Sequence, residues 1–185
     1  MLLKRRPPRI ENRPADTAKG FEHLDPSAIA VLRWLKANRV EFVLVGPVAE
    51  AIRGRMGITG PVSIVPAPYR RNLERLARAL DSAHACIRLD GAGITGEADT
   101  TPTKLTAEKL ARGQTWTLRC GSHDLDIEGH TPGIASYQDL LYEASRFEPA
   151  AGVAVEVASP EDIEHYAHVR RTGTAPEIKV TRVIA

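Results

Sequence analysis

Two short apolar runs on either side of a compact segment constrain the fold of this chain more than any other feature. Residues 41–45 are Glu-Phe-Val-Leu-Val and lead into Gly46, and residues 62–65 are Val-Ser-Ile-Val. Their length and β-branched content predict two strands, and the segment 47–53 between them predicts a short helix. A strand, a helix and a second strand therefore follow one another within a short stretch of chain.

The remaining elements follow from hydrophobic spacing. Apolar residues at helical intervals predict further helices over 26–37, 69–79, 106–112 and 136–142 and a last one that begins after Ser159. Alternating residues predict strands over 84–89, 114–120 and 123–128. A chain of 185 residues that is 43% hydrophobic can bury one core, so we expect a single α/β (α+β) domain with a mixed β-sheet flanked by helices.

Three acidic residues lie on one face of the predicted strand 123–128. Asp124, Asp126 and Glu128 are separated by two residues each, which is roughly 7 Å along a strand. Neighbouring carboxylates repel one another unless a cation, a basic side chain or solvent offsets their charge. Two interpretations follow: a solvated face neutralised by Arg119, or part of a functional site.

The last predicted helix carries ionisable residues along its length. Glu161 with His165, and Glu164 with His168, are four residues apart, and we expect ordinary surface pairing. The helix ends near residues 170 and 171, two arginines that suit the negative end of the helix dipole. The alternative is a metal site formed by these His and Glu side chains, for which the sequence offers no fourth ligand.

Taken in order, these elements resemble the polymerase-beta-like nucleotidyltransferases, in particular the minimal, antitoxin-type members. The strand ending in Gly46, the short helix and the strand from Val62 match the layout of the family signature hG[GS]…DhDh. The segment Gly121–Asp126 is similar to the later strand that supplies a third carboxylate, with Asp126 at the matching position. The resemblance spans about residues 25–170 and implies a nucleotidyltransferase-like fold.

The residues that carry the family's chemistry differ here. The two metal-binding carboxylates are replaced by Pro61 and Ser63, and the second Gly or Ser of the phosphate-holding turn is replaced by Pro47. Metal-dependent transfer uses two cations about 4 Å apart, held by ionised carboxylates. Proline cannot ligate a metal and has no N–H to donate to a phosphate, and Ser63 offers only a neutral hydroxyl. The resemblance therefore implies a catalytically inactive protein that binds a nucleotide or a protein partner, with Asp126 as a candidate remnant of the catalytic site.

Two other functions stay open. An active enzyme would need Mg²⁺ or Mn²⁺ with a nucleoside triphosphate, and its relocated carboxylates would be Asp124, Asp126 and Glu128, or Glu97 and Asp99. The third function, which the resemblance implies, is an antitoxin-like interaction module with a protein partner or a homodimer. If a nucleotide binds, the candidate contacts are Gly46, Arg53, Arg55, Ser63 and Lys104.

The N-terminal residues 1–22 differ in composition from the rest of the chain. Residues 1–20 hold six basic groups against two acidic groups, whereas the rest holds 19 basic against 21 acidic groups. We expect a flexible basic arm over 1–22, a domain over 23–185, and nucleic-acid contact only through the arm. Residues 90–103, rich in Gly, Asp and Thr, predict a mobile loop.

The two cysteines and the length of the apolar runs bear on location. Cys86 and Cys120 lie in strand-like runs without a CxxC motif, which favours reduced, structural thiols. No apolar run approaches the length of a membrane span. We therefore expect a cytoplasmic protein without a membrane partner.

Overall fold

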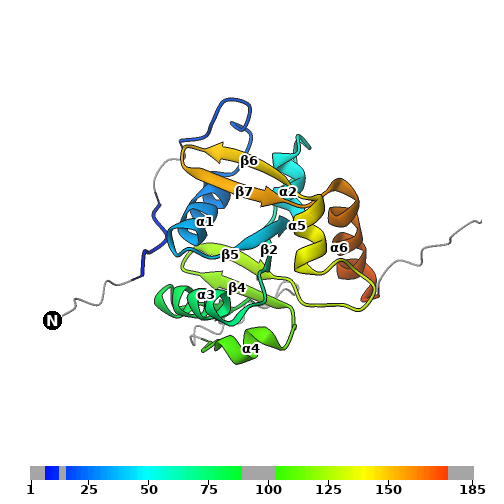
Figure 1. The fold of residues 1–185 in the computed structure, drawn as a ribbon. Helices are drawn as coiled ribbons and strands as arrows, with labels where there is room; N and C mark the ends of the chain where they lie inside the picture. The colour runs from blue at the N-terminus through cyan, green and yellow to red at the C-terminus, as the bar shows by residue number, and fades with distance from the viewer. Residues whose placement is uncertain (1–6, 13–15, 89–102, 175–185) are drawn as a thin grey trace, which may run out of the picture.

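The computed structural model describes residues 7–12, 16–88 and 103–174. These residues form a mixed α/β fold with six helices and one seven-stranded mixed sheet, which confirms the expected fold class (Figure 1). The expected mobile loop falls almost entirely on residues outside the described ranges. In the described ranges, no helix combines the length and the apolar character that a membrane crossing needs.

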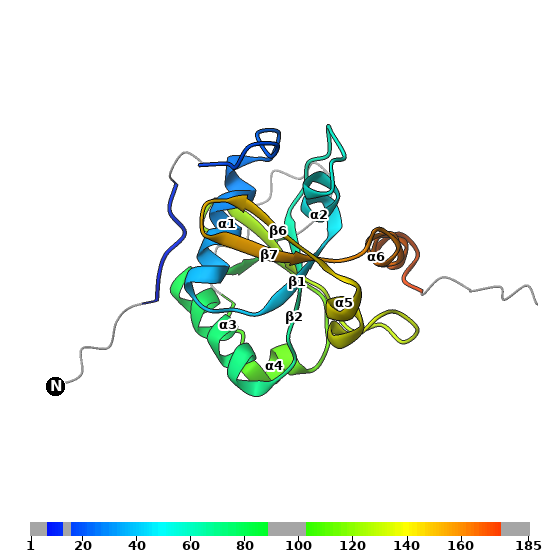
Figure 2. The ribbon, with the colours of Figure 1, turned by 45° about the horizontal axis from the view of Figure 1, so that its top comes forward.

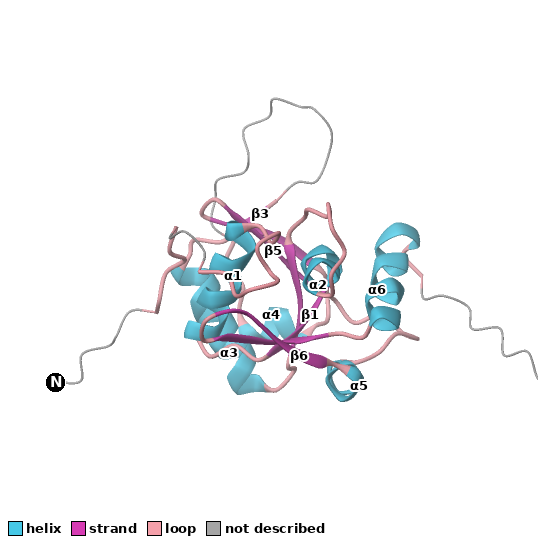
Figure 3. Cartoon of the chain, turned by 90° about the horizontal axis from the view of Figure 1, so that it is seen from above, coloured by secondary structure: helices cyan, strands magenta, loops and turns pink. Residues whose placement is uncertain are grey.

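The elements alternate along the chain. In order they are α1 (Pro26–Ala37), β1 (Phe42–Val45), α2 (Gly46–Ile52), β2 (Val62–Pro66), α3 (Arg70–Ser82), β3 (Cys86–Ile87), α4 (Ala107–Ala111), β4 (Trp116–Cys120), β5 (His123–Ile127), α5 (Tyr137–Glu143), β6 (Ser145–Ala150), β7 (Val153–Val157) and α6 (Pro160–Thr172). In Figures 2 and 3, α1 and α3 lie on one side of the strands and α6 lies on the other. The sheet is therefore the central layer between two groups of helices.

The strand order in the sheet is β3-β4-β5-β2-β1-β7-β6. The β2–β5 and β1–β7 pairs are parallel, and the other neighbours are antiparallel. In the β2–β5 pair, Ser63 lies opposite Asp126. In the β1–β2 pair, Ser63 lies opposite Val45, the last residue before Gly46. The register thus brings Gly46, Ser63 and Asp126 together at the middle of the sheet.

Helix α1 has the bounds that the sequence predicts, because its signals are local. Asp25 caps it, with Oδ1 accepting a hydrogen bond from the Ser27 amide at 2.8 Å, and Pro26 occupies the first turn. Its apolar residues pack into the core; the buried ones are Ala28, Ile29, Ala30, Val31, Leu32, Trp34 and Leu35. The helix thereby covers one face of the sheet.

Other predicted elements differ in extent. Helix α3 continues to Ser82, beyond the expected end, and in the described residues β3 is only Cys86–Ile87. Strands β6 and β7 were not predicted. They pair with each other, and an edge of the sheet is formed by β6. Its sequence contains Pro149, which weakens a strand signal and is tolerated mainly at edges.

The described part of the expected arm contacts the domain. The Ala18 amide donates a hydrogen bond to the Pro149 carbonyl at 2.8 Å, and Thr17 forms a bridge with Ala150. Phe21 packs edge-on against Phe147, with ring centroids 6.5 Å apart. In the described part of the expected arm, residues 17, 18 and 21 therefore contact the edge of the sheet at β6.

Candidate functional site

A cavity of about 900 Å³ lies where β2 and β5 meet α2 and α6. Its lining residues come from the start of α2, from β2 and β5, and from one side of α6. This volume lies within the range of small-molecule sites in proteins. The cavity is therefore the candidate site, and its chemistry depends on the polar side chains that face it.

Gly46 and Ser63 form one wall of the cavity. Gly46 has φ +73°, and a Cβ atom placed there would lie 2.7 Å from Ser63 Oγ. Only glycine fits this position. Any other residue would be strained at this φ, and its Cβ atom would collide with the Ser63 side chain. The Ser63 side chain is buried and lies beside Asp126. The tight turn from β1 into α2 thus places a hydroxyl group at the base of the cavity.

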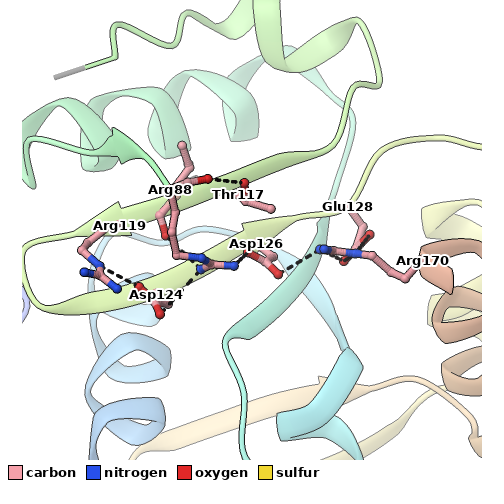
Figure 4. A network of polar contacts seen from close by, with 8 residues as sticks. Arg88, Thr117, Arg119, Asp124, Asp126, Glu128 and Arg170 are labelled. Atoms are coloured by element: carbon pink, nitrogen blue, oxygen red, sulfur yellow. Dashed lines mark hydrogen bonds and ion pairs between the residues drawn. The ribbon is translucent and has the colours of Figure 1, made fainter. Parts of the chain in front are cut away.

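Asp126 is held between two guanidinium groups (Figure 4). Arg88 Nη2 lies 3.0 Å from Oδ1, and Arg170 Nη2 lies 2.9 Å from Oδ2. The aspartate side chain is only 3% exposed. Burial raises the pKa of Asp126, while the two arginines oppose this shift. Both carboxylate oxygens therefore have a cationic partner.

The flanking acids share these arginines. Arg170 Nε lies 2.9 Å from an oxygen of Glu128, and Arg88 Nη1 lies 3.7 Å from an oxygen of Asp124. Burial raises the pKa of Glu128, and Arg170 opposes the shift. Arg119 Nε donates to Asp124 at 3.0 Å. The predicted neutralisation by Arg119 is therefore confirmed for Asp124, whereas the expectation of a solvated face is wrong for Asp126.

The structure also bears on a rebuilt metal site. In the part of the chain that is described, no three His, Cys, Asp or Glu side chains form a group that could hold a metal ion. The acids of β5 face arginines, and a divalent cation beside them would have to displace a guanidinium group. Glu97 and Asp99, the other acids considered, lie outside the described residues.

The predicted nucleotide contacts divide into two groups. Gly46, Arg55 and Ser63 line the cavity, whereas Arg53 and Lys104 are not among its lining residues. Arg53 donates from Nε and Nη2 to two carbonyl groups at the end of β7, at 2.8 and 3.2 Å. Its guanidinium also lies over the Phe147 ring, 5.5 Å from the centroid. Arg53 is therefore committed to packing α2 against β7 and is not carried into the candidate site.

The two arginines that bind Asp126 were not predicted from the sequence. Arg170 was expected to serve only the helix dipole, and Arg88 was not singled out. Backbone pairing positions Arg88, since its amide donates to the Thr117 carbonyl at 2.9 Å. Helix α6 is oriented by buried Ile163 and Tyr166, which turn Arg170 toward β5. The sequence feature that could have indicated them is the row of Asp124, Asp126 and Glu128, because three neighbouring carboxylates need cationic partners in the folded protein.

The other side chains of α6 pair locally. Arg171 Nη2 lies 3.0 Å from Glu164, which takes the place of the expected pairing of Glu164 with His168. His165 and Glu161 lie 3.9 Å apart, as the sequence suggested. Both pairs are largely exposed and contribute little to stability.

Comparison of the sequence with protein-family models gave no match, and a search among curated proteins gave none. The order of elements and the residues of the cavity are therefore the basis for assigning a function.

Proposed function

We propose that this chain is a nucleotidyltransferase-like protein that binds a nucleotide without transferring it. The observation that carries the proposal is the environment of Asp126, whose two oxygens each bind a guanidinium group. Metal-dependent transfer needs carboxylates that are available to cations. Here Pro61 and Ser63 line the cavity where the family resemblance implies two more acids, and Asp126 is neutralised by arginines.

Several features support a retained ligand site. The strand, the positive-φ Gly46, the short helix and β2 follow in the order that the resemblance implies. The cavity of about 900 Å³ has room for a nucleotide. Arg55 lines the cavity and has 66% of its side chain exposed, so its guanidinium group is accessible to an anionic ligand. The proposed ligand is therefore a nucleotide held by protein groups.

A protein-interaction module is a second candidate, and a different surface favours it. Tyr142 on α5 is 88% exposed, and the adjacent Leu141 is 36% exposed. Neighbouring exposed apolar side chains of this size are typical of interaction surfaces. A partner protein or a second copy of the chain would cover them in this proposal.

The relocated-carboxylate enzyme is the third candidate, and the ion pairs count against it. Asp124, Asp126 and Glu128 would have to release Arg88 and Arg170 before two cations could bind. Separating the buried pairs is costly, because the side chains of Asp126 and Glu128 are 3% and 8% exposed and that of Arg88 is 14% exposed.

The experiment is calorimetric titration with each nucleoside triphosphate, together with an assay for pyrophosphate release in Mg²⁺ or Mn²⁺. We expect saturable binding of at least one nucleotide and no pyrophosphate release above the blank. Arg55→Ala should weaken binding, whereas Arg78→Ala, the same change on the exposed face of α3, should not.

Two outcomes would contradict the proposal. Pyrophosphate release that is lost in Asp126→Ala would establish an active enzyme. No binding of any nucleotide, together with a stable partner whose binding is lost in Tyr142→Ala, would establish the interaction module.

A further inference from the structure

We propose that the cavity holds the phosphate groups of its ligand directly, through the Ser63 hydroxyl and the arginine side chains, with no bridging metal ion. This inference rests on the proposed nucleotide-binding function and names how the ligand is held. The arginines concerned line one cavity but come from three separate places in the chain; they are Arg55, Arg88, and the adjacent Arg170 and Arg171 of α6.

Ser63 is the first observation. It is 3% exposed, and its side chain lines the cavity. No hydrogen bond of the described residues uses its Oγ atom, and this atom is not fully buried, since the fully buried polar side-chain atoms without a partner among the described residues are Trp34 Nε1 and Trp116 Nε1. The Ser63 hydroxyl group is therefore open to the cavity. A hydroxyl can donate a hydrogen bond to a ligand oxygen there.

The arginine donors are the second observation. A guanidinium carries five N–H groups, and its planar fork fits a phosphate. Arg170 uses Nε and Nη2 for the acids of β5, and its Nη1 has no acceptor in the described part of the chain. Arg55 donates to Glu50 from Nη1 alone, and Arg171 donates to Glu164 from Nη2 alone. Each of these three arginines therefore keeps donors that a phosphate can use.

Acidic side chains hold the arginines of the cavity in position for a phosphate. Each arginine of the cavity is paired with an acid, and these pairs hold the guanidinium groups in place; the acids are Glu50, Asp124, Asp126, Glu128 and Glu164. Pre-positioned donors lose less conformational entropy on binding. The same acids repel a phosphate, so we expect moderate affinity. Salt screens the attraction between arginine and phosphate, so this affinity should fall as ionic strength rises.

Metal independence follows from the same contacts. A bridging cation would need carboxylate oxygens that are not already bound, and both oxygens of Asp126 bind guanidinium groups. Mg²⁺ also removes negative charge from a polyphosphate, which weakens its attraction to arginine. Adding Mg²⁺ should therefore leave binding unchanged or weaken it.

The test is calorimetric titration with inorganic tripolyphosphate, ATP and adenosine, each in EDTA and in Mg²⁺ at constant ionic strength. We expect tripolyphosphate to bind in EDTA. Ser63→Ala, which keeps the Cβ atom, should raise its dissociation constant about three- to tenfold, the effect of one hydrogen bond. Arg55→Ala should weaken binding as well, and Arg78→Ala is the matched control outside the cavity. Thermal melts confirm that each variant is folded.

The outcomes separate this inference from the proposed function. If the nucleotide binds only with Mg²⁺, or if tripolyphosphate does not displace it, the inference of metal-free phosphate binding is overturned. The proposed nucleotide-binding function would still stand. Unchanged tripolyphosphate affinity in Ser63→Ala would also overturn the inference. Pyrophosphate release would instead overturn the non-catalytic function, and failure of all three probes to bind would overturn the inference.

Discussion

Gly46→Ala tests whether the turn from β1 into α2 depends on a missing Cβ atom. Two separate effects destabilise this variant. Alanine at φ +73° occupies the left-handed region, which costs about 1–2 kcal/mol for a residue with a Cβ atom. The new Cβ atom would lie 2.7 Å from Ser63 Oγ and 2.8 Å from Ser63 Cβ, and such overpacking costs about 1–3 kcal/mol. We expect the free energy of unfolding to fall by about 2–5 kcal/mol.

Gly57→Ala is the matched control. Gly57 has nearly the same backbone angle, φ +74°, and a Cβ atom there meets no atom within 4 Å. This variant should therefore lose only the backbone part, about 1–2 kcal/mol. Urea denaturation, followed by circular dichroism, measures both losses on the same scale.

A double-mutant cycle isolates the collision. Ser63→Gly removes both atoms that the new Cβ atom would approach, so it should relieve the packing part of the Gly46→Ala loss and leave the backbone part. We expect a coupling free energy of about 1–3 kcal/mol between the two positions. If Gly46→Ala costs no more than Gly57→Ala, or if the cycle shows no coupling, the argument from close packing is refuted.

Three further predictions concern other parts of the fold. Asn72→Ala should lower the free energy of unfolding by about 3 kcal/mol in urea denaturation, because this buried amide pairs with one backbone N–H and two carbonyl groups, at 2.8 to 2.9 Å. Arg170→Ala should lower the free energy of unfolding by about 2 kcal/mol, since it leaves the largely buried carboxylates of Asp126 and Glu128 short of a partner. Arg171→Ala should cost under about 1 kcal/mol, and equal losses would contradict the ion-pair argument. Burial raises the pKa of Cys120 to about 12, so its thiolate is absent until the pH approaches that value. A disulfide reagent at mildly alkaline pH should therefore modify Cys86 before Cys120 in the folded protein. Cys86→Ser should remove this early reaction.

Much of the fold was predictable because its signals are local. Asp25, Pro26 and the apolar spacing define α1 within a few residues of chain, and the bounds agree with the structure. The strand that contains Ser63 was found in the same way. Strand β6 was missed, because Pro149 and its charged neighbours give no strand signal and the segment becomes a strand only by pairing with β7.

The candidate site was predictable in part. The alternation of β5 places Asp124, Asp126 and Glu128 on one face, and the order of elements led us to expect Asp126 in the same site as Ser63. Neither feature indicates what neutralises the acids. Arg88 and Arg170 are 38 and 44 residues from Asp126, at separations that carry no periodic signal.

The sequence by itself therefore determined, for the described residues, the six helices, five of the seven strands, the turn at Gly46 and the face on which the acids lie, because each depends on neighbouring residues. Only the tertiary structure decided that each carboxylate oxygen of Asp126 binds an arginine. The physical reason is that electrostatic pairing depends on distances of about 3 Å between atoms, and these distances exist only after α6 has packed against α2 and β1 and after β3 has paired with β4.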